Sequence, residues 1–195
     1  MSTERMDARP AMAEHARAVY AAARSLYSAA EVNDAVAAMA RAIRADLEAR
    51  DPLLLCVMVG GLVPTGLLLP HLAFPFRLDY LQATRYRGTT RGGGLEWRAR
   101  PRTPLAGEHV LIVDDILDEG VTLAAVCEWC REQGAASVRT AVLVEKQHAR
   151  NQTGLCADYV GLDVPDVYVF GSGMDYHEYL RNAPGVFAVA DGDAS

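Results

Sequence analysis

Long hydrophobic runs and abundant cysteine are both missing from this sequence of 195 residues. No apolar run is long enough to span a bilayer, and residues 1–10 are charged and polar, unlike a signal peptide. The four cysteines are too few for a disulfide framework in a chain of this length. We therefore expect a cytoplasmic protein with reduced thiols and no membrane partner.

Internal repeats, low-complexity linkers and an excess of positive charge are missing as well. The length suits one domain with a sizeable core, so we expect a single domain over residues 1–195. The 19 Lys and Arg residues against 25 Asp and Glu residues leave a net charge of −6. Because non-specific nucleic-acid binding depends on a basic surface, we expect no nucleic-acid partner. A small anionic ligand remains possible, since it needs only a local positive site.

Strand-like and helix-like segments alternate along the chain. Residues 11–49 contain no Gly or Pro and place apolar residues at helical spacing, which predicts two helices broken near residues 28–33. Later apolar runs are typical of strands buried on both faces. We predict helices at residues 62–72 and 122–133, and strands at residues 53–59, 78–83, 95–99, 110–113, 138–144, 159–162, 167–170 and 186–190. This alternation predicts an α/β fold with a central, mainly parallel sheet flanked by helices.

The strand predicted at residues 110–113 ends in an acidic segment. Clustered carboxylates repel one another and are costly to bury, so a function must compensate for them. Gly120 and Thr122 then lead into a helix whose N-terminus suits a phosphate. Neither GxxxxGK[ST] nor GxGxxG occurs, so neither nucleotide-binding fingerprint applies. The carboxylates of this segment are Asp114, Asp115, Asp118 and Glu119.

Two classes of ligand remain open for the acidic segment. Vicinal carboxylates accept hydrogen bonds from a ribose diol, directly or through Mg²⁺-bound water. A carboxylate one turn later can exchange a proton with a ring nitrogen. These properties favour a sugar phosphate, and the alternative is a Mg²⁺-binding loop or a solvated acidic turn.

Residues 110–122 resemble the phosphoribosyl-diphosphate (PRPP) signature of type I phosphoribosyltransferases. That signature is an apolar strand, two acidic residues, two apolar residues, Asp, a variable residue, Gly, any residue and Thr. Other segments over residues 50–190 resemble the hypoxanthine-guanine branch of this family, in the same order. They are a pyrophosphate loop at residues 59–61, a flexible loop starting at residues 85–86, a strand ending in Lys at residues 143–146, and a hood at residues 165–171 and 174–181.

The resemblance implies a type I phosphoribosyltransferase fold with N-terminal helices at residues 11–49, a core at residues 50–162 and a small hood at residues 163–190. A flexible loop is implied at about residues 85–97. The implied reaction is Mg²⁺-dependent transfer of the 5-phosphoribosyl group from PRPP to hypoxanthine, and to guanine, giving IMP or GMP plus pyrophosphate in purine salvage. A homodimer or homotetramer is also implied. The alternatives are a xanthine-preferring enzyme and a regulatory protein of this fold that senses a nucleotide or RNA.

The resemblance gives the acidic segment three roles. Asp114 and Asp115 hold the ribose hydroxyls and, with Asp175, are the candidate Mg²⁺ ligands. Asp118 is the catalytic residue, acting as general base or hydrogen-bond partner at purine N7. Glu119 stands where relatives often carry Thr, so we expect no role for its side chain. The 5′-phosphate is bound by the backbone of Asp118, Glu119, Gly120, Val121 and Thr122, and by the Thr122 hydroxyl.

The resemblance also assigns residues to the purine. Lys146 donates to the 6-oxo group and so selects oxopurines over adenine. Tyr168 stacks on the base, and the Val169 backbone pairs with the edge of the base. Asp175 belongs to the same purine site.

The remaining implied positions bind pyrophosphate or close the site. Gly60 and Gly61 offer backbone N–H groups to pyrophosphate, which glycine allows to approach closely. Arg181 contacts the same group. Arg85 and Tyr86 begin a lid that excludes water from the reacting sugar.

Cysteine and histidine indicate no metal centre. Cys127 and Cys130 form a CxxC pair, but no second pair exists to complete a zinc site. With Leu123 and Val126 they recur at helical spacing, so we predict that both face the core. No metal-ligand spacing relates His71, His109, His148 and His177.

Overall fold

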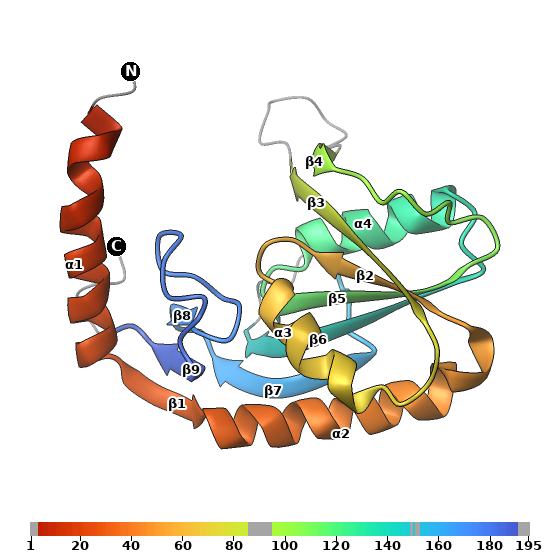
Figure 1. Ribbon diagram of the computed structural model, residues 1–195, viewed down its shortest axis with the longest axis horizontal. Helices are drawn as coiled ribbons and strands as arrows, with labels where there is room; N and C mark the ends of the chain where they lie inside the picture. Colours follow the sequence, from red (N-terminus) through yellow and green to blue (C-terminus); the bar gives the residue numbers. More distant parts are fainter. Residues whose placement is uncertain (1–3, 86–94, 149, 151–152, 191–195) are drawn as a thin grey trace.

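The computed structural model describes residues 4–85, 95–148, 150 and 153–190, and its centre is a six-stranded sheet (Figure 1). The strands lie in the order β4-β3-β2-β5-β6-β7. Every neighbouring pair is parallel except β3 with β4, which confirms the predicted mainly parallel sheet. The bounds are β2 (Leu53–Val57), β3 (Arg77–Arg85), β4 (Leu95–Ala99), β5 (His109–Leu117), β6 (Ser137–Gln147) and β7 (Tyr159–Pro165).

Helices cover both faces of this sheet, as expected for an α/β fold. One face packs against α2 (Ala29–Leu47) and α3 (Leu62–Leu68). The other face packs against α4 (Val121–Glu132). Short 3₁₀ turns, η1 (Glu48–Arg50) and η2 (Leu69–His71), extend α2 and α3.

The alternation of side chains along β5 shows why its sequence is apolar without interruption. Leu111 and Val113 pack in the cluster that contains α2 and α3, whereas Val110 and Ile112 pack in the cluster with α4. Successive side chains of a strand point to opposite faces, so a strand covered on both faces needs apolar residues at every position. The α4 cluster also buries Cys127 and Cys130, which confirms their predicted place in the core.

The N-terminal segment differs from the sequence prediction. The two helices are separated by a strand, β1 (Arg24–Ser28), which follows α1 (Glu4–Ala22). Ser28 caps α2: its hydroxyl accepts the Glu31 N–H at 3.3 Å, and its N–H donates to the Glu31 carboxylate at 2.8 Å. The break predicted near residues 28–33 is therefore wrong, because these residues cap and begin α2.

A second, three-stranded antiparallel sheet forms the hood, in the order β1-β9-β8. Its C-terminal strands are β8 (Val169–Phe170) and β9 (Gly185–Ala188). The hood thus joins a strand from the start of the chain to the C-terminal segment that follows β7. Residues 163–165 of the predicted hood segment are the end of β7 in the main sheet. Val19 of α1 packs there in a cluster with Phe170 and Tyr176. Figure 1 shows α1 and this sheet at one end of the six-stranded sheet, where the arrow of β7 points.

Within the described residues, no helix combines the length and the apolar character that a membrane crossing requires.

Candidate active site

Two of the four acidic residues lie in a strand, whereas Asp118 and Glu119 lie in the turn that follows it. β5 continues beyond Val113 through Leu117, so Asp114 and Asp115 are strand residues. β5 stays paired in parallel with β6 beyond Val113: Asp114 lies beside Val142, and Leu117 lies beside Glu145. Carboxylates are disfavoured in strands, but this ladder overrides the local preference. The same extension of β6 to Gln147 places Lys146 near the end of the neighbouring strand.

Gly60 and Gly61 lie between β2 and α3 in close contact with β5. A Cβ on Gly60 would have all three carboxyl atoms of Asp115 within 2.7 Å. A Cβ on Gly61 would lie 2.6 Å from the carbonyl oxygen of Val113 and 2.7 Å from that of Val57. Both distances are far shorter than ordinary contacts, so only glycine allows this turn to pass beside the acidic strand.

Asp114 and Asp115 are adjacent carboxyls in a partly enclosed position. Desolvation raises the pKa of Asp114 well above its usual range, and the neighbouring charge of Asp115 raises it further. Desolvation also raises the pKa of Asp115, although a bond with Asp114 and the nearby Arg181 guanidinium oppose the shift. A ligand that brings hydroxyl donors or a cation would therefore stabilise both carboxyls in the ionised form.

Asp118 is surrounded by cations and hydrogen-bond donors. Its Oδ2 accepts a hydrogen bond from Lys146 Nζ at 2.8 Å, and its Oδ1 lies 2.6 Å from His148 Nε2. Arg150 Nη2 lies 3.6 Å from the same Oδ1. Desolvation raises the pKa of Asp118, but the bonds from Lys146 and His148 outweigh it, so the pKa lies below its usual value. Asp118 is therefore an ionised carboxylate near neutral pH.

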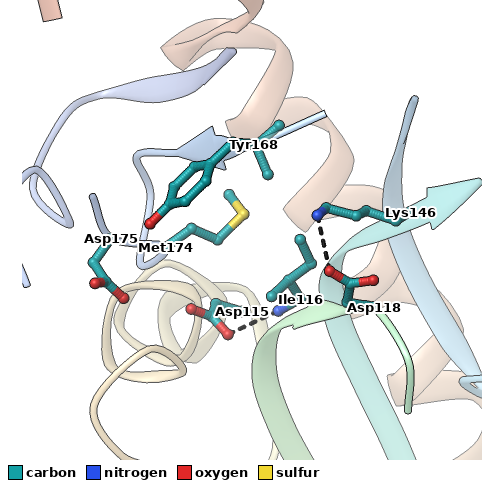
Figure 2. A pocket seen from close by; sticks show the side chains of 8 residues that line it. Asp115, Ile116, Asp118, Lys146, Tyr168, Met174 and Asp175 are labelled. Atoms are coloured by element: carbon teal, nitrogen blue, oxygen red, sulfur yellow. Dashed lines mark hydrogen bonds and ion pairs between the residues drawn. The ribbon is translucent and has the colours of Figure 1, made fainter. Parts of the chain in front are cut away.

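A cavity of about 230 Å³ opens beside Asp118 and Lys146, between the main sheet and the hood (Figure 2). Tyr168 forms one wall, and its side chain is about one third exposed. The cavity thus offers an aromatic face, apolar contacts and charged groups to one ligand. Figure 2 shows side chains reaching it from both layers; its lining comprises Asp115, Ile116, Asp118, Lys146, Tyr168, Val169, Met174 and Asp175.

A second cavity of about 360 Å³ lies over the turn between β5 and α4. Gly120 is the N-cap of α4 and adopts φ +75°, a left-handed conformation that glycine accepts without strain. Glu119 is exposed. The positive end of the α4 dipole faces this turn, so the cavity suits an anion. Its lining comprises Asp114, Ile116, Leu117, Asp118, Glu119, Gly120, Val121, Thr122 and Leu123.

The hood brings Arg181 and Asp175 to the acidic strand. Arg181 Nη2 lies 2.6 Å from Asp175 Oδ1, and Arg181 Nη1 lies 3.8 Å from Asp115 Oδ2. The Arg181 guanidinium also donates to the carbonyl of Gly173 at 2.7 Å. A Cβ on Gly173 would lie 2.9 Å from Pro64 of α3, so the hood packs closely on the start of that helix. The hood and the Gly60 turn therefore meet at Asp115.

The chain is similar to a known protein family and to individual proteins. The family described as phosphoribosyl transferase domain matches residues 23–178. The chain belongs to this family. The chain is 30% identical over 161 residues to the hypoxanthine-guanine-xanthine phosphoribosyltransferase of Tritrichomonas foetus, covering 83% of this chain and 88% of that protein. The hypoxanthine-guanine phosphoribosyltransferase of Bacillus subtilis is also 30% identical, over 82% of this chain and 88% of its own length.

Solved structures give the same family assignment. A hypoxanthine-guanine phosphoribosyltransferase from Bacillus anthracis superposes with a TM-score of 0.78 at 25% identity, covering 85% of this chain and 96% of that one. A hypoxanthine phosphoribosyltransferase from Trypanosoma cruzi, complexed with the product IMP, gives a TM-score of 0.79 at 26% identity, covering 87% and 92%. The predicted type I phosphoribosyltransferase fold and the likeness to the hypoxanthine-guanine branch are confirmed.

Most of the positions singled out through the family resemblance come together in the structure. Asp115, Asp118, Lys146, Tyr168 and Asp175 line one cavity together with Val169, and the turn predicted to bind phosphate lines the next. The predicted flexible loop at about residues 85–97 lies mostly outside the described residues, and residues 95–97 belong to β4. Arg85 is the last residue of β3, and Tyr86 lies outside the described residues.

The acidic residues are also candidates for holding a metal ion. In the part of the chain that the structure describes, no three His, Cys, Asp or Glu side chains come close enough to hold an ion by themselves. Mg²⁺ in phosphoryl enzymes is held by one or two carboxylates together with phosphate oxygens and water, not by an all-protein cage. The adjacent Asp114 and Asp115 fit that kind of shared site.

Two charged residues at the site have no role in the sequence prediction. His148 contacts Asp118, and Arg150 joins Asp118 to Asp166 at the turn after β7. No local pattern identifies them, because their partners are 16 to 32 positions away and meet only when β5, β6 and β7 pair. The one signal in the sequence was that both residues lie within four positions of Lys146.

Proposed function

We propose that this protein transfers the 5-phosphoribosyl group of PRPP to a 6-oxopurine, hypoxanthine and guanine, and releases pyrophosphate in purine salvage. The proposal depends mainly on one observation: Asp118 and Lys146 form an ion pair inside a cavity walled by Tyr168. The cavity adjoins an acidic pair and a helix N-terminus, which suit ribose and phosphate.

The ion pair explains the choice of base. Lys146 Nζ and Asp118 Oδ2 are 2.8 Å apart without a ligand. A 6-oxopurine supplies an acceptor, O6, to Lys146 and a donor, the N7 proton, to Asp118, so it replaces one ion pair by two charge-assisted hydrogen bonds. Adenine presents an amino group at position 6, which leaves the Lys146 donors without an acceptor.

Asp118 also has a place in the chemical step. N9 of the purine forms a bond to C1′ of the sugar while the bond from C1′ to the pyrophosphate oxygen breaks, and pyrophosphate leaves with the electron pair. The proton on N7 passes to Asp118, which is ionised beforehand. Tyr168 is proposed to stack on the base, and the Val169 backbone to pair with its edge.

The sugar and its phosphates are proposed to lie along β5 and the turn after it. Asp114 and Asp115 accept the ribose hydroxyls and favour positive charge developing on the sugar. The backbone over residues 118–122 and the Thr122 hydroxyl bind the 5′-phosphate. Gly60, Gly61 and Arg181 bind pyrophosphate, since the Gly60 turn and Arg181 both meet Asp115.

The cofactor is proposed to be Mg²⁺ bound to PRPP, with Asp114, Asp115 and Asp175 as the residues that would hold it. When bound, the ion neutralises charge on the diphosphate and so favours its departure. Arg181 now pairs with Asp175 at 2.6 Å, so a cation and the guanidinium would share that carboxylate.

A dimer or tetramer and a cytoplasmic location remain predictions. Four large apolar side chains are 44 to 52% exposed: Val59, Leu62, Leu78 and Tyr80. Leu78 and Tyr80 of β3 pair with Leu54 and Cys56 and share one face of the sheet. A second copy of the chain is proposed to cover Leu78 and Tyr80. Light scattering at graded protein concentrations measures the assembly.

The proposed activity is tested by incubating the purified protein with PRPP and Mg²⁺ and, in parallel, hypoxanthine, guanine, xanthine or adenine. Nucleotide formation and pyrophosphate release are measured together. Turnover of hypoxanthine or guanine with little turnover of adenine is expected. Xanthine is included because the Tritrichomonas foetus relative carries it in its name. PRPP binding without turnover of any base would instead favour a regulatory protein.

A further inference from the structure

We infer that His148 is a positioning residue: it holds Asp118 by Oδ1, so that Oδ2 is presented to the N7 proton of the purine. This inference rests on the proposed function. The contact that carries it is the 2.6 Å distance between His148 Nε2 and Asp118 Oδ1. The His148 side chain is only 5% exposed, so the histidine side of this contact is shielded from water.

The backbone of Arg150 determines which nitrogen of His148 carries the proton. The Arg150 N–H donates to His148 Nδ1 at 2.9 Å, so Nδ1 is an acceptor. A neutral imidazole has one donor and one acceptor nitrogen, so the proton lies on Nε2 and is donated to Asp118. His148 therefore does not take the N7 proton from Asp118, because its facing nitrogen is already protonated.

Arg150 also fixes the segment that carries His148. Its guanidinium lies 2.5 Å from Asp166 Oδ1 and 3.6 Å from Asp118 Oδ1. The turn after β6 is thereby tied to the turn after β7. Rotation of the imidazole would break bonds at both ring nitrogens, so His148 is held in one orientation.

The two oxygens of Asp118 then have different functions. Lys146 and Asp118 line the cavity, whereas His148 is outside its lining and approaches Asp118 from behind. Lys146 holds Oδ2 without a ligand and releases it when O6 of a purine becomes its acceptor. Oδ1 stays with His148, so the carboxylate keeps its orientation when the ion pair opens and the proton moves from N7 to Oδ2.

The groups around His148 predict a change in pH dependence. The charged groups that face it are Asp118, Lys146 and Arg150, with Asp166 behind Arg150. Turnover needs ionised Asp118 and falls as the pH drops through its pKa. Hydrogen bonds from Lys146 and His148 lower this pKa, so loss of His148 raises it and moves the acidic limb to higher pH.

The test compares His148→Ala with His148→Gln, whose terminal amide N–H can replace the Nε2 donor. We expect His148→Ala to lower kcat by roughly 10- to 100-fold, the cost of about 1 Å of misplacement at a reacting group. KM for PRPP should change little. In the pH profile of kcat/KM, the acidic limb should move to higher pH. His148→Gln should keep most of the wild-type kcat, and the acidic limb of its pH profile should lie at the wild-type pH. His71→Ala, an exposed histidine at the end of η2, is the matched control and should leave both unchanged.

Nitrogen NMR of the free wild-type protein provides a readout that needs no turnover. The protonated Nε2 form of His148 is expected, assigned by its absence in His148→Gln. The inference would be overturned if Nδ1 of His148 carried the proton. It would also be overturned if His148→Ala kept the wild-type kcat and pH profile, or if His148→Gln and His148→Ala lost the same amount of activity. If wild-type protein forms no nucleotide from any base, the proposed function fails, and the NMR result still reports separately on His148.

Discussion

Gly60→Ala tests whether the site depends on the close approach of the Gly60 turn to Asp115. A Cβ here would have the Asp115 carboxyl atoms within 2.7 Å, whereas ordinary contacts begin at 3.4 Å. The carboxyl group must therefore move by roughly 1 Å, and a displacement of this size at a site of reaction costs on the order of 10²-fold in rate. Asp115 has little room to adjust, because its Oδ1 accepts the Ile116 N–H at 2.9 Å and Arg181 lies beside Oδ2.

The assay is kcat/KM for PRPP with hypoxanthine, with thermal unfolding measured on the same samples. Gly66→Ala is the matched control, since a Cβ on this residue of α3 meets nothing within 4 Å. The control should keep its activity and gain about 0.5–1 kcal/mol of stability from the more helix-favouring residue. Gly60→Ala with wild-type kcat/KM would refute the role given to this turn.

Three further predictions concern the residues proposed to bind the base, and the thiols. Asp118→Asn should lower kcat by about 10²–10⁴-fold in steady-state assays, because it removes the proton acceptor; a wild-type kcat would exclude Asp118 from the step. Lys146→Ala should reduce hypoxanthine turnover relative to adenine, and unchanged base selectivity would contradict its role. Burial raises the pKa of Cys127 to about 11 and of Cys130 to about 12, so at pH 8 a thiol reagent should label exposed Cys156 quickly and these two only on unfolding. Rapid labelling of Cys127 or Cys130 in the folded Cys156→Ser variant would contradict their burial.

Local patterns predicted the main sheet because its strands are buried on both faces. In β5, Val110 and Ile112 face α4 while Leu111 and Val113 face α2 and α3, so the whole strand is apolar and easy to recognise. The same pattern could not predict where the strand ends. Asp114 and Asp115 have little strand preference, and only pairing with β6 keeps them extended.

The hood strand β1 depends on partners far away in the sequence. Arg24 lies beside Ala188 and Ser28 beside Gly185 in the hood sheet. A five-residue segment between two helices has no pattern of its own that predicts this pairing. The capping box of Ser28 and Glu31 was the local signal that could have placed the start of α2 correctly.

The site was predicted through its resemblance to a family more than through its chemistry. The acidic segment alone allowed a sugar phosphate, a Mg²⁺ loop or a solvated turn. The motifs then pointed to Lys146, Tyr168 and Asp175, and the structure places all three around one cavity. His148 was not assigned a role, because its closeness to Lys146 in the sequence does not show that the fold places it 2.6 Å from Asp118.

The most direct test of the proposed transfer is to quantify IMP and pyrophosphate by chromatography after incubation of the purified protein with PRPP, Mg²⁺ and hypoxanthine. We predict that the two products form in equal amounts in the wild type and that both are strongly reduced in Asp118→Asn. Pyrophosphate released without IMP would show hydrolysis of PRPP instead of transfer. The absence of IMP, with PRPP bound, would contradict the proposed activity.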